Sequence, residues 1–165
     1  SEMCIRDRSK CFDAHPNLEL MFLGDGASLP ELKRKWRSHP QVRFAPFLPY
    51  AQAKEIIGTA DIGVVSLNTN LYKVAYPSKL GTYLDLGLKV LALIEHQSQL
   101  ALELENSGQG AVPENVDAES IRLAVERLIK SKAKPKMTEG YMESYVSEEW
   151  RRRMIEAIEQ GTRNG

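Results

Sequence analysis

Short apolar runs alternate with amphipathic segments of helical length along most of this chain. Leu18 and residues 20–23 form an apolar run that ends at Gly24, which is typical of a buried parallel strand. By the same criteria the sequence predicts further strands at residues 42–44, 61–65, 90–94 and 110–112, helices at 29–38, 51–60, 78–86 and 99–106, and a loop at 67–76. Strands and helices that alternate through short turns predict an α/β fold with a doubly wound parallel sheet.

Two of the predicted helices carry clear boundary signals. In residues 78–86, Ser78 is a candidate N-cap and Gly87 a candidate C-terminal stop. Asp117 is predicted to cap the next long helix. The predicted inward stripe of that helix consists of Ile121, Ala124, Val125, Leu128 and Ile129.

The pattern divides the chain into three parts. Residues 9–130 are predicted to form one α/β domain, and residues 131–165 a lysine-rich linker followed by a C-terminal helix that begins at Ser147. Residues 1–8 resemble one translated frame of a transposon end used in preparing sequencing libraries. We therefore expect residues 1–8 to be an artefact that takes no part in the fold. We also expect the natural gene to extend upstream.

Composition and charge narrow the class of protein. Lys plus Arg and Asp plus Glu are both 22, so the formal net charge is zero, and no basic stripe with aromatic residues points to nucleic acid. No apolar run is long enough to cross a bilayer. Cys4 and Cys11 lack metal-ligand spacing, so no metal is expected and a reducing, cytoplasmic setting fits best.

Ligands of doubly wound sheets bind beyond the carboxyl ends of the strands, which directs attention to residues 24–26, 44–49, 66–78 and 95–97. Gly24, Asp25 and Gly26 lie between a strand and a helix, where glycines admit a ligand to the backbone; a simple tight turn explains them equally well. Ser78 and Lys79 open a helix that leads into a buried strand, an arrangement suited to a phosphate. A capped core helix with a solvated lysine is the alternative.

An ordered set of four segments resembles the group 1 glycosyltransferases, the large retaining family 4 of GT-B fold. Residues 77–90 resemble the family's Pro-Ser-Lys-Leu-x-x-Tyr-Leu-x-x-Gly-x-Pro-Val segment. Residues 20–26 resemble its strand followed by Gly-Asp-Gly, residues 42–47 its Val-x-Phe-x-Gly strand, and residues 60–62 its Ala-Asp-Ile strand entry. The four segments occur in family order and at family spacing.

The resemblance implies the Rossmann-like C-terminal half of a GT-B fold, with added C-terminal helices, that binds a UDP- or GDP-sugar as donor. The acceptor would bind to a missing N-terminal domain, and no separate cofactor is implied. By position, the donor site would comprise Gly24, Asp25, Gly26, Phe47, Leu48, Pro77, Ser78, Lys79, Leu80 and Thr82. The family's diphosphate-binding Arg and Lys would lie upstream, so the catalytic residues are unknown and this chain alone is expected to be inactive.

Three positions depart from the family pattern. Thr82 and Val74 stand where the family has two glutamates, and Pro46 replaces the usual glycine. A hydroxyl at Thr82 loses the charge-assisted hydrogen bond that a carboxylate makes to a ribose. A non-catalytic nucleotide-sugar-binding or interaction module is therefore the main alternative, with a sugar-nucleotide epimerase and an unrelated flavodoxin-like domain as further ones.

Two other features remain as weaker candidates. His96, at the end of a predicted strand, is expected to be a surface histidine, with a role in the cleft as the alternative. Arg151 to Arg153 are expected on a solvated helix face. Peripheral contact with anionic lipid at the inner face of the membrane is the alternative, because many such enzymes use lipid-linked acceptors.

Overall fold

The computed structural model describes Phe12, residues 15–66 and residues 78–132, apart from the side chains of Ser78 and Gln99. Five strands and five helices follow one another in this part of the chain: β1 (Leu20–Leu23), α3 (Leu29–Trp36), β2 (Val42–Ala45), α4 (Tyr50–Ile57), β3 (Ile62–Ser66), α5 (Ser78–Asp85), β4 (Lys89–Leu93), α6 (Gln99–Asn106), β5 (Gly110–Ala111) and α7 (Ala118–Lys130). The predicted alternation of strands and helices is confirmed. The predicted artefact at residues 1–8, the loop at 67–76 and the helix from Ser147 lie outside the described residues.

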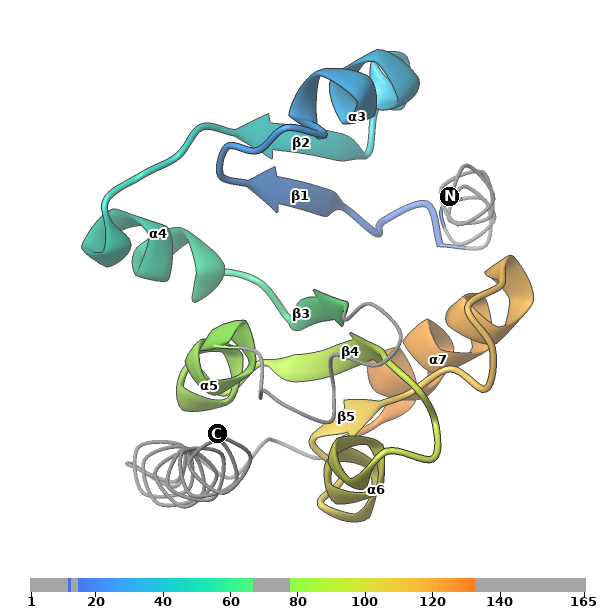
Figure 1. Ribbon diagram of the computed structural model, residues 1–165. Coiled ribbons are helices and arrows are strands. Elements are labelled where there is room, and N and C mark those ends of the chain that lie inside the picture. The colour runs from blue at the N-terminus through green and yellow to red at the C-terminus, as the bar shows by residue number, and fades with distance from the viewer. Residues whose placement is uncertain (1–11, 13–14, 67–77, 133–165) are drawn as a thin grey trace, which may run out of the picture.

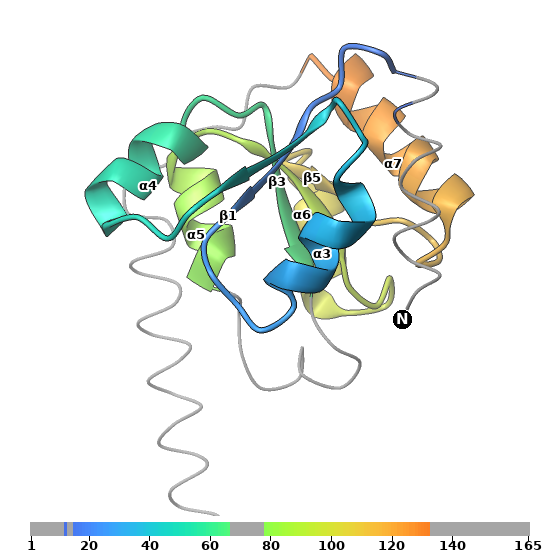
Figure 2. The same cartoon turned by 90° about the horizontal axis from the view of Figure 1, so that it is seen from above.

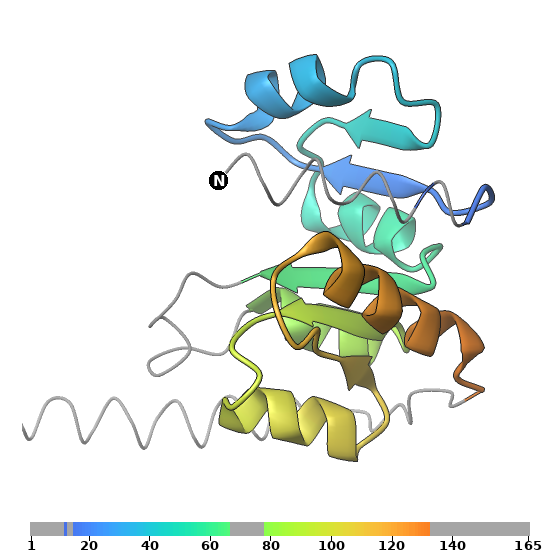
Figure 3. The ribbon, with the colours of Figure 1, turned by 90° about the vertical axis from the view of Figure 1, so that its right-hand side faces the viewer.

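The parallel strands form two small sheets (Figure 1). β1 pairs with β2, and β3, β4 and β5 form the second sheet in that order. Figures 1 and 3 agree that β1 lies between β2 and β3, but no backbone hydrogen bond joins β1 to β3 in the described part of the chain. This parallel α/β architecture is compatible with a Rossmann-like fold. The sequence predicts one continuous sheet. The described strands form two sheets instead, because β1 and β3 do not pair with each other.

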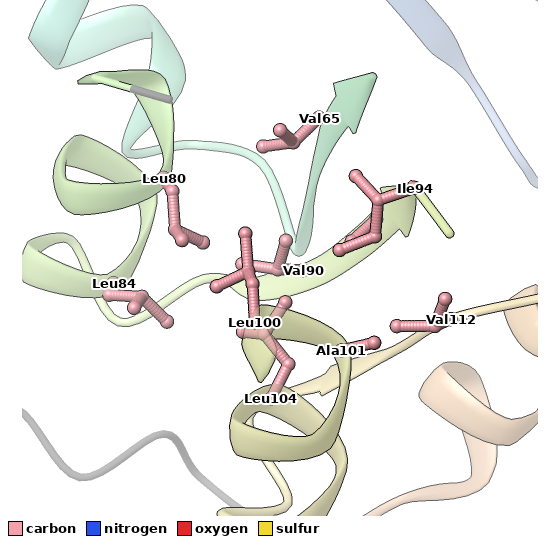
Figure 4. Packing of buried hydrophobic residues seen from close by; sticks show 10 residues of the cluster. Val65, Leu80, Leu84, Val90, Ile94, Leu100, Ala101, Leu104 and Val112 are labelled. Atoms are coloured by element: carbon pink, nitrogen blue, oxygen red, sulfur yellow. The ribbon is translucent and has the colours of Figure 1, made fainter. Parts of the chain in front are cut away.

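The second sheet is covered on both faces, and this is where the main core lies. Along β4 the side chains alternate, so Val90 and Ala92 join one cluster while Leu91 and Leu93 join the other. The first cluster packs against α5 and α6 (Figure 4), and the second packs against α7, which lies on the opposite face of the sheet (Figure 3). All four side chains are at most 5% exposed, as expected for a parallel strand buried on both faces.

Helix α5 ends in a hydrogen-bonded stop at Gly87. Gly87 has φ +72°, its N–H donates to the Leu84 carbonyl at 3.0 Å, and the Leu88 N–H donates to the Tyr83 carbonyl at 2.9 Å. These two bonds are those of a Schellman motif, in which glycine tolerates the left-handed backbone. The predicted stop at Gly87 is confirmed, and it turns the chain from α5 into β4.

Helix α7 is fixed at both ends. Asp117 is the N-cap, as predicted, and its carboxylate accepts the Ser120 N–H at 2.8 Å. At the other end, the Lys89 ammonium donates to the carbonyls of Leu128 at 2.7 Å and Ser131 at 2.6 Å. A cation there satisfies carbonyls that a helix end leaves without partners.

The prediction is wrong for one residue of the inward stripe of α7. Ile121, Ala124, Val125 and Leu128 are buried, but Ile129 is 47% exposed. It follows Leu128 by one residue, about 100° around the helix, and so lies at the margin of the stripe.

The first sheet is smaller and more open. The Phe22 and Phe44 rings, on paired positions of β1 and β2, stack with centroids 5.2 Å apart. Trp36 of α3 is 5% exposed and packs edge-on against Phe12. The sequence predicts a strand buried on both faces. Met21 in the middle of β1 is 46% exposed, however, so one face of this strand is open to solvent.

Helices α3 and α4 are shorter than predicted. Helix α3 ends at Trp36, and the 37–38 segment turns toward β2. Helix α4 ends at Ile57, because Gly58 follows and the Thr59 hydroxyl donates to the Ile56 carbonyl at 2.7 Å. No side chain of α4 is fully buried, and Ile56 and Ile57, which were expected inward, are half-buried.

Candidate functional site

The carboxyl ends of β1, β3 and β4 lie along one edge of the molecule, toward the bottom of Figure 2. The loop from β1 to α3 and the turn after β4 leave from this edge, and α5 follows β3 in the chain. Parallel strands place their carboxyl ends together, and ligands of α/β sheets bind at that end. We call these segments the carboxyl edge.

The turn after β1 leaves its backbone open. Gly24 has φ +122°, and its N–H donates to the Ala45 carbonyl at 3.2 Å. A Cβ atom built on Gly24 or Gly26 would have nothing within 4 Å. The glycines are therefore not required by crowding, and a ligand has room to approach the backbone here.

The charges around this turn are acidic. Asp25 is exposed, and Glu31 lies in the first turn of α3. Pro30 removes one N–H from that turn, and the Ser28 side chain makes no capping hydrogen bond. Two carboxylates at this position suit the hydroxyl groups of a sugar better than a phosphate.

The loop after β2 presents aromatic surface. Phe47 is 74% exposed and Leu48 is half-buried. Tyr50, the first residue of α4, is 68% exposed and was not predicted as a site residue. Its place three positions after Phe47 is the feature of the sequence that could have identified Tyr50 as a site residue. Exposed aromatic faces here offer stacking surfaces to a planar ligand.

Helix α5 begins at Ser78, one residue earlier than a capping role for Ser78 requires, so Ser78 is the first helical residue and not the predicted N-cap. Lys79 is exposed, as a contact to an anion requires. Leu80 is 1% exposed and belongs to the first core cluster, so its side chain packs in the core and does not face a ligand. Thr82 is half-buried; Pro77 and Val74 lie outside the described residues.

The face of α5 that meets β3 is tightly packed through Tyr83. A Cβ atom on Gly63 would lie 2.3 Å from Cδ2 of the Tyr83 ring, so the ring lies directly on the β3 backbone. Burial of this phenol raises the pKa of Tyr83 above its ordinary value. The contact joins the C-terminal half of α5 to the beginning of β3.

A histidine in the turn after β4 lies near a carboxylate that also pairs with an arginine. His96 Nε2 lies 3.8 Å from Glu105 Oε2, and Glu105 Oε1 lies 3.5 Å from Arg127 Nη1. Arg127 also donates to the Val112 carbonyl at 3.0 Å. The surface position predicted for His96 is confirmed, since its side chain is 43% exposed. Its neighbour Glu105 comes from α6, and the Arg127 that pairs with Glu105 comes from α7, at sequence separations that no local pattern reveals.

The described residues contain neither a metal-binding cluster nor a membrane-spanning helix. They contain no cluster of three or more His, Cys, Asp or Glu side chains arranged for a metal ion. Within the same ranges no helix is both long and apolar enough to cross a bilayer.

Comparison with known proteins gives no match for this chain, either with protein-family models or among curated protein sequences. Its function is therefore inferred from the residues and the geometry above.

Proposed function

We propose that this chain is the donor-binding half of a retaining glycosyltransferase of GT-B fold, which transfers a sugar from a nucleotide diphosphate to a glycan or lipid-linked acceptor. The observation that carries the proposal is the open backbone at Gly24 and Gly26 on the carboxyl edge. The ordered resemblance of residues 17–128 to that family supports it. We place the protein in the cytoplasm, at the inner face of the membrane if the acceptor is lipid-linked.

In this proposal each segment of the carboxyl edge binds a different part of the donor. Phe47 and Tyr50 stack on the base, because both rings are largely exposed beside the end of β2. Lys79 and the first N–H groups of α5 bind the diphosphate. Asp25 accepts hydrogen bonds from sugar hydroxyls, which suits the acidic character of its turn. Leu80 contributes packing alone.

The proposal also explains the two separate sheets. They would be the two halves of one doubly wound sheet, completed by an upstream strand that bonds to the free edges of β1 and β3. In the family this upstream segment brings the diphosphate-binding Arg and Lys. Transfer with departure of a diphosphate depends mainly on electrostatic stabilisation of that leaving group. The chain as given would bind the donor weakly and would not turn it over.

Thr82 favours a second candidate, a non-catalytic module that binds nucleotide sugars. It is half-buried on α5 where the family has a glutamate, and its hydroxyl replaces a charged hydrogen bond with a neutral one. Thr82→Glu separates the two candidates. We expect a donor-binding half of a transferase to gain affinity for UDP-glucose or GDP-mannose, whereas a module adapted to threonine loses it.

Calorimetric titration of UDP- and GDP-sugars into the chain tests the proposal. We expect weak binding that is reduced about tenfold by Lys79→Ala, as for loss of one charge-assisted contact. Lys132→Ala is the matched control, because Lys132 is equally exposed but follows α7 at the opposite edge. No heat of binding up to millimolar ligand, or equal loss in both variants, contradicts the proposal.

A further inference from the structure

We infer that the space between the facing edges of β1 and β3, which we call the β1–β3 interval, is a docking site for one parallel strand that is apolar on both faces. Its occupant is a strand of the same polypeptide upstream of Phe12, and in that respect the inference rests on the proposed function. The two edges and the layers beside them add the direction of this strand, its hydrogen-bond partners and the side chains that it covers.

Alternate residues of β1 direct their backbone groups away from β2. The N–H groups of Leu20 and Gly24 donate toward β2, at 2.8 and 3.2 Å. Successive residues of a strand direct their backbone groups to opposite edges, so those of Met21 and Leu23 point to the other edge. That edge lies toward β3, because β1 lies between β2 and β3 in Figures 1 and 3.

Strand β3 has a matching open edge. The Lys89 N–H donates to the Asp61 carbonyl at 3.1 Å, so residues 61, 63 and 65 bond to β4. The backbone groups of Ile62 and Val64 then point toward β1, and no hydrogen bond joins them to another strand in the described part of the chain. A strand in the β1–β3 interval would bond to both sheets, whereas the outer edges of β2 and β5 offer bonds on one side alone.

The directions of the two strands fit one intervening strand. The carboxyl ends of β1 and β3 both lie toward the bottom of Figure 2, where the strands cross obliquely. Neighbouring strands in a sheet are rotated by about 20–25°, so strands one position apart are rotated by about twice as much. Within the described elements β1 packs closely on β2 and β3 on β4, but β1 and β3 do not pack closely on each other. The occupant therefore runs parallel to both and ends at the carboxyl edge.

Helix α4 provides an incomplete layer on one face of the β1–β3 interval. Ala53, Ile56 and Ile57 form a stripe at helical spacing, and all three are only half-buried. The helix joins β2 to β3 and lies level with the interval in Figures 1 and 3. A Cβ atom on Gly58 would lie 3.7 Å from Leu86 Cδ2, which places the end of α4 on the side of α5. Apolar side chains of an inserted strand would complete the burial of this stripe.

The opposite face of the interval is also partly covered. Leu18, Ile62 and Val64 pack against the second core cluster, on the side of α7, and remain half-buried. A strand inserted beside them would shield them from solvent on the side of β1. Since both faces of the interval are apolar, its occupant should be apolar on both faces, as β4 is.

The way in which the chain enters β1 indicates where the occupant comes from. Phe12 has helical backbone, and its carbonyl accepts the His15 N–H at 3.2 Å, so a helical turn leads into β1. Adjacent parallel strands are joined by a crossover that is usually a helix, and elements consecutive in sequence are usually neighbours in space. The strand that precedes the helical turn at Phe12 is therefore the one that reaches the interval.

The test is amide hydrogen exchange measured by NMR, on the chain alone and with a synthetic peptide that copies residues 88–94 and carries added lysines at both ends. In the chain alone, the Val64 amide should exchange about tenfold faster than the Val65 amide, because only the latter is bonded to β4. The same difference is expected between Met21 and Phe22 of β1.

The peptide should slow exchange at Met21 and Val64 about tenfold, as expected when each gains one hydrogen bond. A spin label at the carboxyl end of the peptide reports its direction. It should broaden the Gly24 and Ser66 signals at the carboxyl edge and not the Asp61 signal at the amino edge. A control peptide in which alternate apolar residues are replaced by serine should not bind.

Two variants test the two kinds of contact separately. Val64→Pro removes a donor of the open edge while the bonds to β4 remain, and should weaken peptide binding about tenfold. Ile56→Ser should weaken binding through the α4 layer, and Glu55→Ser, at an exposed neighbouring position, is its control. Circular dichroism should show the variants folded. If Val64→Pro does not fold, the comparison of Ile56→Ser with Glu55→Ser decides.

Four results would overturn the inference: no protection at millimolar peptide, equal protection of Phe44 on the outer edge of β2, equal binding of the serine peptide, or a spin label at the amino edge. Failure of the proposed function gives a different pattern. In that case UDP-glucose and GDP-mannose give no heat of binding, while the peptide still protects Met21 and Val64. Binding of a nucleotide sugar without any protection by the peptide would refute the inference and leave the proposed function standing.

Discussion

Gly63 on β3 and Tyr83 on α5 are in such close contact that a single methyl group at Gly63 would lie 2.3 Å from the tyrosine ring. The contact joins the strand that ends at the carboxyl edge to the helix that begins there. It explains why glycine stands in an otherwise apolar, β-branched strand. The packing of the C-terminal half of α5 on β3 therefore depends on this pair.

Gly63→Ala should destabilise the protein by about 1–3 kcal/mol, because the added methyl group forces the buried ring or the strand to move. Gly26→Ala is the control, since nothing lies within 4 Å of its Cβ position and no positive φ is required there. Urea unfolding of the two variants measures the difference. Equal stability of Gly63→Ala and the unchanged chain would contradict the close packing of Tyr83 on β3.

Tyr83 should also make the protein sensitive to alkali. Burial raises the pKa of Tyr83, so the unfolded chain loses this proton at lower pH than the folded chain. Its contribution to stability is therefore complete below about pH 10, the ordinary tyrosine value, and is lost as the pH rises through the raised pKa. Tyr83→Phe should weaken this alkaline loss of Tm. An identical alkaline Tm profile in Tyr83→Phe would place the phenol in solvent.

Lys89 should contribute more to the free energy of unfolding than an exposed lysine such as Lys130 does. Lys89→Met removes both donors to the carbonyls of Leu128 and Ser131, at a cost of about 1–3 kcal/mol. Lys130→Met is the control, because Lys130 is largely exposed and its pair with Glu126 should contribute less than about 1 kcal/mol. Chemical denaturation of the two variants decides, and comparable losses would contradict the proposed role of Lys89.

The cap of α7 predicts a dependence on acid. The Ser120 N–H is the main cause that lowers the pKa of Asp117, so the cap is fully stabilising above the ordinary aspartate value and is lost as the pH falls through the lowered pKa. Asp117→Ala should lower Tm at neutral pH. The difference from the unchanged chain should shrink below about pH 4. If Asp117→Ala and the unchanged chain differ in Tm by the same amount at neutral pH and below about pH 4, the Asp117 carboxylate does not act as the cap.

The sequence predicts the local elements well, because each depends on a short pattern. Gly87 and Asp117 act as the stop and cap that their residue types indicate. Ile129 shows the limit of such patterns, because it lies at the margin of the stripe and is 47% exposed. The unpaired edges of β1 and β3 could not be predicted, because strand pairing is a long-range property that apolar runs do not specify.

The candidate site was predicted only in part. Asp25, Gly26, Phe47 and Lys79 are exposed, and their part in a donor site stays a prediction. Leu80 was assigned to the ligand but lies in the core, because this third residue of α5 is on the face of the helix that packs on the sheet. His96 lies near Glu105 of α6, which in turn pairs with Arg127 of α7, and only the folded chain brings these three residues together.

The most direct test of the account is a map of the donor site by NMR. Amide chemical shifts of the labelled chain are followed while UDP-glucose or GDP-mannose is added. We predict that the shifts concentrate at residues 24–28, 46–50, 78–82 and 95–98. Shifts that concentrate instead around residues 41–42 and 89 at the amino edge, or no shifts at millimolar ligand, would contradict a nucleotide-sugar site at the carboxyl edge.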